Sequence, residues 1–163
     1  MNPSPKPVQN LPTQYTLTQK LTCLFESVLH DFVGLSVEES SSRSRNTNQM
    51  PLERRVRLFG STSVLVVMRS HPVFAEALAE RFQSDQADPT PSEEAFMELL
   101  DRYCGAFIGE FLPTDNFLPF KPELSQPGIW PARPSDVCFA VEVMGQPVEV
   151  RFWIGTREGL YEI

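Results

Sequence analysis

Three acidic residues and a glycine recur at helical spacing beyond the middle of the chain: Glu94, Glu98, Asp101 and Gly105. At about 100° per residue, the four fall within one narrow stripe on the surface of a helix. Acidic residues three and four positions apart repel one another by roughly a few tenths of a kcal/mol per pair, so stability alone does not favour them. Carboxylates accept hydrogen bonds and attract cations. The stripe is therefore the candidate functional surface of the sequence.

Two other interpretations of the stripe stay open from the residues alone. Most surface charges only keep a protein soluble, so Glu94, Glu98 and Asp101 also fit a solvated acidic face. Clustered carboxylates suit hard cations too, but no further ligand residue can be assigned, and a metal site therefore ranks lower. Gly105 would either let the backbone of a partner approach closely or relieve crowding against the protein's own sheet.

The helix that carries the stripe has the clearest start signal in the sequence. Thr90 is a typical N-cap, Pro91 suits the first helical position, and Glu93 follows three residues after the cap. We expect this helix to continue to about Phe111, which gives a rod of roughly 30 Å at 1.5 Å per residue. Its opposite side must face the core, because it is apolar there: Phe96, Leu99, Leu100, Tyr103, Cys104 and Phe107.

Two helices and a hairpin are expected before this helix. A capping box at Thr16 and apolar residues at helical spacing predict a helix that ends at Gly34. Residues 55–59 and 63–68 have strand patterns and predict a hairpin. A helix over residues 71–82 follows, with Ser70 as its N-cap. Its expected buried stripe is Val73, Phe74, Ala77, Leu78 and Phe82.

The residue patterns of the remaining segments predict one further hairpin and three irregular segments. Residues 137–143 and 148–154 alternate around Gly145-Gln146 and predict a second hairpin. Residues 113–135 hold six prolines and predict a long irregular loop, and residues 39–50 offer nothing to bury. Residues 1–14 are expected to be a mobile proline-rich tail, and residues 15–163 a single domain. This order of elements predicts an α+β fold, with helices packed on an antiparallel sheet.

Charge and apolar content exclude several classes of protein. The net charge is −7, and residues 61–163 hold sixteen acidic against seven basic residues, so nucleic acid is a poor partner. The longest apolar run, residues 64–68, is too short to cross a bilayer, and no signal peptide is evident. We therefore expect no membrane partner and a cytoplasmic location.

The cysteines and arginines suggest no second site. Cys23, Cys104 and Cys138 are far apart with no metal-ligand spacing, which favours buried free thiols. Five arginines between residues 43 and 57 would form either a basic patch for an acidic partner or, more simply, a solvated loop and strand edge.

The residues from Arg57 to Phe107 resemble the CheC/CheX family of chemotaxis phosphatases. One helix of that family carries four motif residues: an acid or serine, a Glu, an Asn and a Gly. Three residues separate the first two, two residues separate Glu from Asn, and three separate Asn from Gly. Here the same spacing holds Glu94, Glu98, Asp101 and Gly105, after a hairpin and a helix in the family's order. CheC proteins repeat the motif on their first helix. In this chain Leu29 stands where the amide would be, so one site at most is expected, as in CheX.

The resemblance implies an antiparallel CheC/CheX-like fold and hydrolysis of the aspartyl phosphate on a response-regulator receiver domain. Glu98 would contact a lysine beside the phosphate, and Asp101 would orient the attacking water, while Glu94 and Gly105 would contact the partner. Asp101 replaces the family's Asn, and its negative charge would weaken catalysis more than binding. The resemblance also implies a homodimer, with no cofactor of its own and with Mg²⁺ supplied by the receiver. The alternative is a receiver-binding or dimeric scaffold module of the same fold without catalysis.

Overall fold

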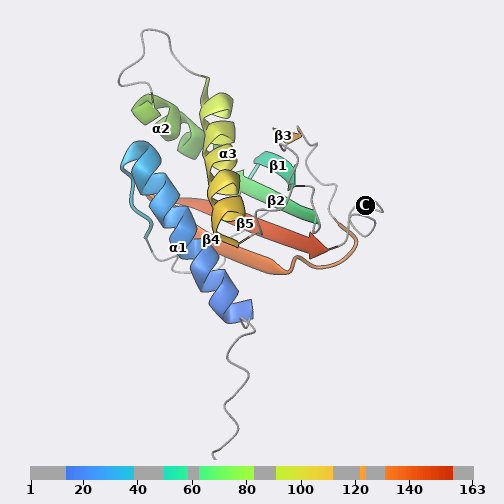
Figure 1. Cartoon of the computed structure of the whole chain (residues 1–163). Helices are drawn as coiled ribbons and strands as arrows, with labels where there is room; N and C mark the ends of the chain where they lie inside the picture. Colours follow the sequence, from blue (N-terminus) through green and yellow to red (C-terminus); the bar gives the residue numbers. More distant parts are fainter. Residues whose placement is uncertain are drawn as a thin grey trace, which may run out of the picture.

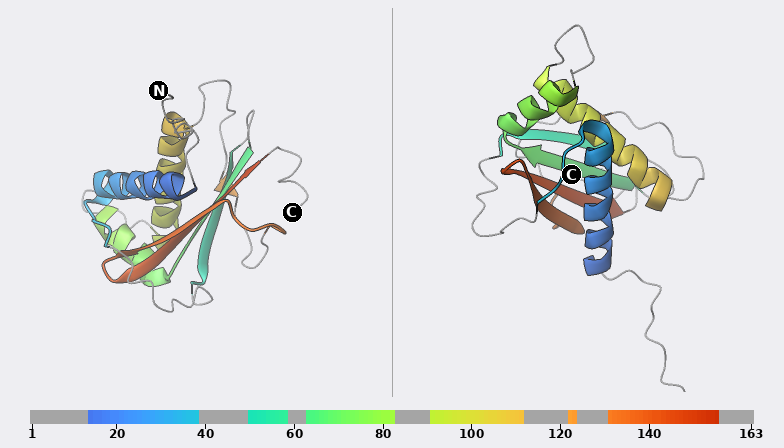
Figure 2. Two further views of the ribbon diagram at one scale, coloured as in Figure 1. Left: turned by 90° about the horizontal axis from the view of Figure 1, so that it is seen from below. Right: turned by 90° about the vertical axis from the view of Figure 1, so that its left-hand side faces the viewer.

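The protein folds as helices packed on one face of an antiparallel sheet, as the sequence predicted (Figure 1). Figure 2 shows this arrangement from two further directions, with the helices gathered on the same side of the strands. The coordinates come from a computed structural model. The residues that the structure describes are 14–38, 50–58, 63–82, 91–111, 122–123 and 131–155.

The sheet joins two antiparallel hairpins through their second strands. The first hairpin consists of β1 (Leu52–Leu58) and β2 (Ser63–Ser70), and the second of β4 (Val137–Val143) and β5 (Gln146–Gly155). The strand order is β3-β1-β2-β5-β4, so β2 and β5 pair at the centre. Because successive side chains of a strand alternate between faces, one face of the sheet supplies apolar residues to the core beneath the helices.

Two local details of the sheet differ from the expectation. The turn of the second hairpin is Met144-Gly145, one residue earlier than expected, and both residues have positive φ angles (51° and 75°). Positive φ at both central residues is the geometry that best matches the twist of the flanking strands. In addition, β3 (Pro122–Glu123) pairs with β1 inside the segment 113–135 that was expected to be irregular. Proline is tolerated there because β3 is an edge strand.

The first helix, α1 (Gln14–Val33), begins two residues before the expected capping box. Thr16 is therefore inside the helix and does not cap it. The other end is as predicted: Gly34 has a φ of +72°, and its N–H donates to the carbonyl oxygen of His30 at 2.8 Å. A left-handed residue at this position favours glycine and closes the helix.

The second helix, α2 (Pro72–Phe82), buries a different face from the one expected. The helix begins at Pro72, and the carbonyl oxygen of His71 accepts from the N–H of Phe74 at 3.1 Å, so the N-cap position belongs to His71 and not to Ser70. The hydroxyl of Ser70, at the end of β2, donates to the same carbonyl oxygen at 3.1 Å. Val73 is 55% exposed, whereas Ala75 and Ala79 are buried together with Phe74 and Leu78. The small alanine side chains face inward because α2 packs closely on α3.

The third helix, α3 (Ser92–Phe111), begins where the sequence predicted. Near its start, the N–H of Ala95 donates to the carbonyl oxygen of Pro91 at 3.1 Å. Thr90, the expected cap, lies outside the described residues. The side predicted to face the core is buried, as expected: Phe96, Leu99, Leu100, Tyr103, Cys104 and Phe107.

A chain of ion pairs joins charged residues on the opposite face of the sheet, the one that the helices do not cover. Arg55 is 4% exposed and its Nε lies 3.2 Å from Glu53, which also lies 3.8 Å from Arg69. Arg69 lies 3.8 Å from Glu149, and Glu149 lies 2.6 Å from Arg151. The expectation of a solvated strand edge or a free basic patch is therefore wrong for Arg55, because it is buried and paired with Glu53 on the same strand.

Smaller expectations about burial also need correction. Met50 is 2% exposed, although the segment that it ends was expected to bury nothing, and residues 39–49 lie outside the described residues. All three cysteines are free, and Cys104 is buried as expected, but Cys23 and Cys138 are exposed. The expected tail also lies outside the described residues, apart from its last residue, Gln14, which begins α1.

Candidate functional site

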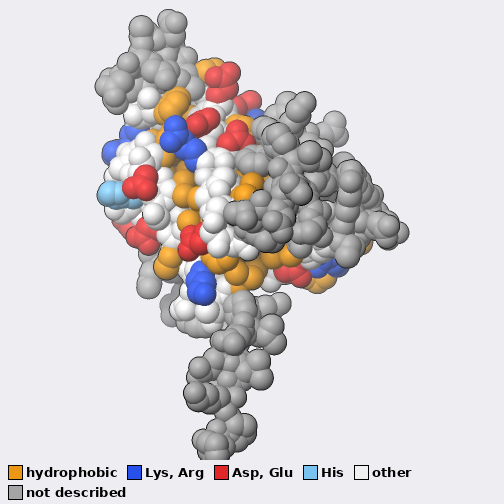
Figure 3. All heavy atoms as spheres, in the orientation of Figure 1, with side chains coloured by type: hydrophobic (Ala, Val, Ile, Leu, Met, Phe, Trp, Pro, Cys, Tyr) orange, Lys and Arg blue, Asp and Glu red, His pale blue; other side chains and the backbone are white. Residues whose placement is uncertain are grey.

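The four residues singled out in the sequence lie along α3 on the side away from the buried residues, and we call them the α3 ridge: Glu94, Glu98, Asp101 and Gly105. Glu94 and Gly105 are exposed, while Glu98 and Asp101 are partly buried. Figure 3 views the molecule from the side of α1 and α3, and acidic and basic side chains lie close together near the upper ends of these helices. The ridge is accessible to another molecule along its length.

Three contacts with other elements hold α3 in place. The hydroxyl of Tyr103 donates to the carbonyl oxygen of Leu21 in α1 at 2.8 Å, inside the core. Phe96 packs edge-to-face on Phe74 of α2, with ring centroids 6.2 Å apart. At the start of the helix, Arg54 of β1 lies 3.0 Å from the carboxylate of Glu93. The ridge is therefore presented by a helix that is fixed to both neighbouring helices and to the sheet.

Glu98 forms an ion pair within α3. The Nε of Arg102 donates to Glu98 Oε1 at 2.9 Å, and the two side chains are 50% and 41% exposed, respectively. The guanidinium carbon of Arg102 also lies 4.6 Å from the ring centroid of Phe32 in α1, a distance typical of a cation–π contact. Sequence reasoning missed Arg102, although its position four residues after Glu98 is the spacing of a favourable helical ion pair.

Asp101 has an unusual environment for a surface carboxyl group. Its Oδ1 is buried and has no hydrogen-bond donor among the described residues. Burial, followed by the negative charge of Glu98, raises the pKa of Asp101 from 3.8 to about 6. Both causes disfavour the charged form, because neither supplies a donor or a positive charge to the carboxylate. Asp101 therefore changes charge near pH 6.

Gly105 is not required by the packing of the described residues. A Cβ atom added to it would meet none of their atoms within 4 Å, and the same is true of Gly109 one turn later. The alternative that Gly105 relieves crowding against the sheet is therefore wrong. Glycine within a helix costs about 0.5–1 kcal/mol relative to alanine. The open space leaves a close approach by another molecule as the interpretation that fits Gly105.

The structure gives little basis for a metal site or a second ridge. Within the described residues, no three His, Cys, Asp or Glu side chains converge as ligands for a metal ion. On α1, Leu29 occupies the position at which a second copy of the motif would need an amide, and its side chain is fully buried in the core. None of the helices in the described part of the chain is long and apolar enough to span a bilayer.

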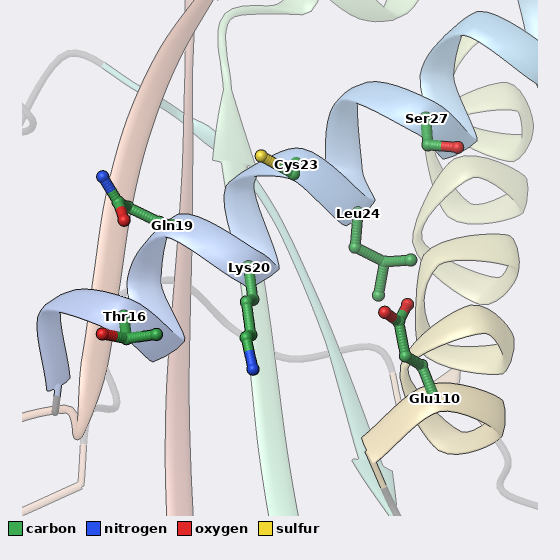
Figure 4. Close-up of a pocket in the computed structure, with 7 residues that line it drawn as sticks. All are labelled: Thr16, Gln19, Lys20, Cys23, Leu24, Ser27 and Glu110. Carbon is green, nitrogen blue, oxygen red and sulfur yellow. The ribbon is translucent and has the colours of Figure 1, made fainter. Parts of the chain in front are cut away.

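A separate hollow of about 510 Å³ runs along α1 toward the end of α3. Figure 4 shows the side chains of α1 on one side of it and Glu110 reaching from α3 toward Leu24. Its lining residues are Thr16, Gln19, Lys20, Cys23, Leu24, Ser27 and Glu110. None of these residues belongs to the α3 ridge.

Comparison with solved structures identifies the fold. A CheX chemotaxis protein from Desulfovibrio desulfuricans superposes with a TM-score of 0.61 at 13% identity, over 85% of this chain and 98% of that one. CheX from Vibrio vulnificus gives a TM-score of 0.58 at 9% identity, over 82% and 95% of the two chains. A structure of the CheX–CheY–BeF₃–Mg²⁺ complex from Borrelia burgdorferi matches with a TM-score of 0.56 at 16% identity, over 84% and 96%.

These matches establish a CheX-like α+β fold for this chain, as the resemblance in its sequence predicted. Neither the protein-family models nor the curated proteins match the sequence. The likeness is therefore one of fold, carried at identities of 9–16%.

Proposed function

We propose that this protein binds the phosphorylated receiver domain of a response regulator through the α3 ridge and hydrolyses its aspartyl phosphate. The observation that carries the proposal is the accessible pair Glu98 and Asp101, one helical turn apart on a firmly packed helix of a CheX-like fold. A protein of this fold occurs in a complex with CheY, BeF₃ and Mg²⁺. Such a partner is also consistent with a cytoplasmic location.

The reaction needs little covalent chemistry from the protein. The oxygen of a water molecule attacks phosphorus, the bond from phosphorus to the aspartate oxygen breaks, and the products are a free aspartate and orthophosphate. Positioning and electrostatics supply most of the rate in such in-line displacements. Asp101 would accept a hydrogen bond from the attacking water, and Glu98 would pair with a lysine of the receiver. The receiver would supply Mg²⁺, which neutralises charge on the phosphoryl group.

The charge of Asp101 would make this reaction slow. An ionised carboxylate about 4 Å from a phosphoryl charge costs about 4 kcal/mol in a partly screened site. At 1.36 kcal/mol per decade, this corresponds to roughly a thousandfold in rate before any compensation. A neutral Asp101 avoids this cost, and its raised pKa of about 6 brings the neutral form within reach of mildly acidic solution.

A non-catalytic receiver-binding or scaffold module of the same fold is the second candidate. Asp101 favours it, because its negative charge opposes the approach of a phosphoryl group more than it opposes docking elsewhere on the ridge. In either case we propose a homodimer, as the resemblance to CheX implies. Light scattering on the purified protein would then measure twice the mass of one chain, which is 18.5 kDa. A measured mass equal to that of one chain would exclude a dimer.

Phosphate release from a panel of phosphorylated receivers tests the two candidates. The phosphatase predicts that the wild-type protein accelerates release from at least one receiver and that Glu98→Ala abolishes the acceleration. Glu80→Ala is the matched control, because it removes an exposed acidic residue from α2 and should leave the rate unchanged. Binding without acceleration would establish the non-catalytic receiver-binding module. Absence of binding to every receiver would contradict both receiver-dependent candidates and leave only the scaffold.

A further inference from the structure

We propose that Arg102 contacts the phosphoryl group of the partner and is the specificity residue that distinguishes the phosphorylated from the unphosphorylated state. This inference rests on the proposed function, because it takes the α3 ridge as the docking surface. It assigns to Arg102 a role that the spacing of the ridge residues did not suggest.

The guanidinium of Arg102 has donors to spare. Arginine carries five N–H donors, and only the Nε–H of Arg102 is engaged, with Glu98. The terminal nitrogens have no hydrogen bond to any described residue, and half of the side chain is exposed. Two terminal N–H groups of a guanidinium match two oxygens of a phosphoryl group. Arg102 can therefore keep its bond to Glu98 and still bind an anion from solution.

Contacts with α3 and α1 hold the guanidinium beside the ridge, and α2 supports one of them. Glu98 binds its Nε from the preceding turn of α3, and Phe32 of α1 supports its face at 4.6 Å. Phe32 in turn packs on Phe82 at the end of α2, with ring centroids 5.2 Å apart. A side chain that is already held in place loses less conformational entropy when it binds a ligand.

Electrostatics assign the phosphoryl contact to Arg102 and to no other residue of α3. Arg102 is the only basic residue in this helix, whose ridge otherwise presents three carboxylates. A positive charge about 4 Å from a phosphoryl charge offsets the repulsion from one carboxylate at the same distance. Arg54 of β1, which contacts the start of α3, is occupied by Glu93 and is only 14% exposed.

Affinity for a receiver with and without beryllofluoride, a mimic of the phosphoryl group, tests this assignment. We expect Arg102→Gln to reduce the affinity for the beryllofluoride-bound receiver about tenfold or more, as for loss of a charge-assisted bond, and that for the free receiver less than about twofold. Arg102→Lys should keep part of the preference, because lysine keeps the charge but not the paired donors. Lys20→Gln, which removes an exposed charge from α1, should change neither affinity.

Two outcomes would overturn the assignment while leaving the docking surface intact. Arg102→Gln could retain the wild-type preference for the beryllofluoride-bound receiver, or it could lower both affinities equally, as a purely structural role predicts. If the wild-type protein binds neither form of any receiver, the proposed function fails and this inference fails with it.

Discussion

At the scale of single residues, the chemistry of the ridge depends on the charge of Asp101. The substitution Asp101→Asn keeps a hydrogen-bond acceptor at this position and removes the negative charge. It therefore tests whether the ionised form of Asp101 opposes the approach of the phosphoryl group. We expect this variant to release phosphate from a receiver faster than the wild type, by between about tenfold and a thousandfold at pH 7.5. Phosphate release at saturating receiver measures the difference. A rate equal to or below that of the wild type would show that the charge does not limit the reaction.

The raised pKa of Asp101 also predicts a pH dependence of stability. The folded state holds the proton up to about pH 6, whereas the unfolded state releases it near pH 3.8, so the free energy of unfolding falls as the pH rises between these values. At 1.36 kcal/mol per pH unit the full effect would be about 3 kcal/mol, and solvent screening of this partly exposed group reduces it to about 1 kcal/mol.

Urea unfolding of the wild type and Asp101→Asn measures this effect directly. The variant should be more stable than the wild type by about 1 kcal/mol at pH 7.5, and the difference should shrink as the pH falls toward 4. A difference that is constant across this range would mean that Asp101 titrates in the folded protein as it does in the unfolded chain.

At the scale of elements, α3 depends on its attachment to α1. Tyr103→Phe removes the hydroxyl that donates to the carbonyl oxygen of Leu21 and changes nothing else in the core. We expect this variant to lose about 1 kcal/mol of unfolding free energy, because a typical buried hydrogen bond contributes about that much. Chemical denaturation checks the value. A loss below about 0.3 kcal/mol would show that the bond does not hold the two helices together.

Substitutions at Gly105 and Gly109 of α3 distinguish an effect on helix stability from an effect on receiver binding. Gly105→Ala and Gly109→Ala should each stabilise the protein by about 0.5–1 kcal/mol, because their added methyl groups meet nothing within 4 Å. If a partner approaches closely at the ridge, only Gly105→Ala should also weaken receiver binding. Thermal unfolding and receiver affinity measure the two effects. Equal affinities for both variants would remove Gly105 from the docking surface.

The elements that sequence alone predicted well are those with local signals. The start of α3 and the strand β2 were predicted from their own residues, and the helical period placed the ridge residues on one side of α3. The missed details depend on contacts between distant residues. The buried face of α2 is decided by its packing on α3. The burial of Arg55 depends on the chain of ion pairs in which its partner Glu53 also pairs with Arg69 of β2. Arg102 is different, because its pairing with Glu98 could be predicted from their four-residue spacing, and only its contact with Phe32 depends on a residue far away in the sequence.

At the scale of the whole molecule, the two sides of the sheet differ in character. The helical side holds the main apolar core and presents the α3 ridge outward. The other side holds the chain of ion pairs across β1, β2 and β5, beside Leu65, Val67 and Trp153. A partner docked on the ridge would therefore contact α3 and its helical neighbours, and not the opposite face of the sheet.

Amide chemical shifts of the protein, recorded while a beryllofluoride-activated receiver is added, test the docking surface most directly. We expect the largest shifts along α3 from Glu94 to Gly105 and at Phe32 of α1, which supports Arg102. Amides of β1, β2 and β5 should change little. Shifts centred on the sheet, with α3 unaffected, would contradict the assignment of the ridge as the surface that binds the receiver.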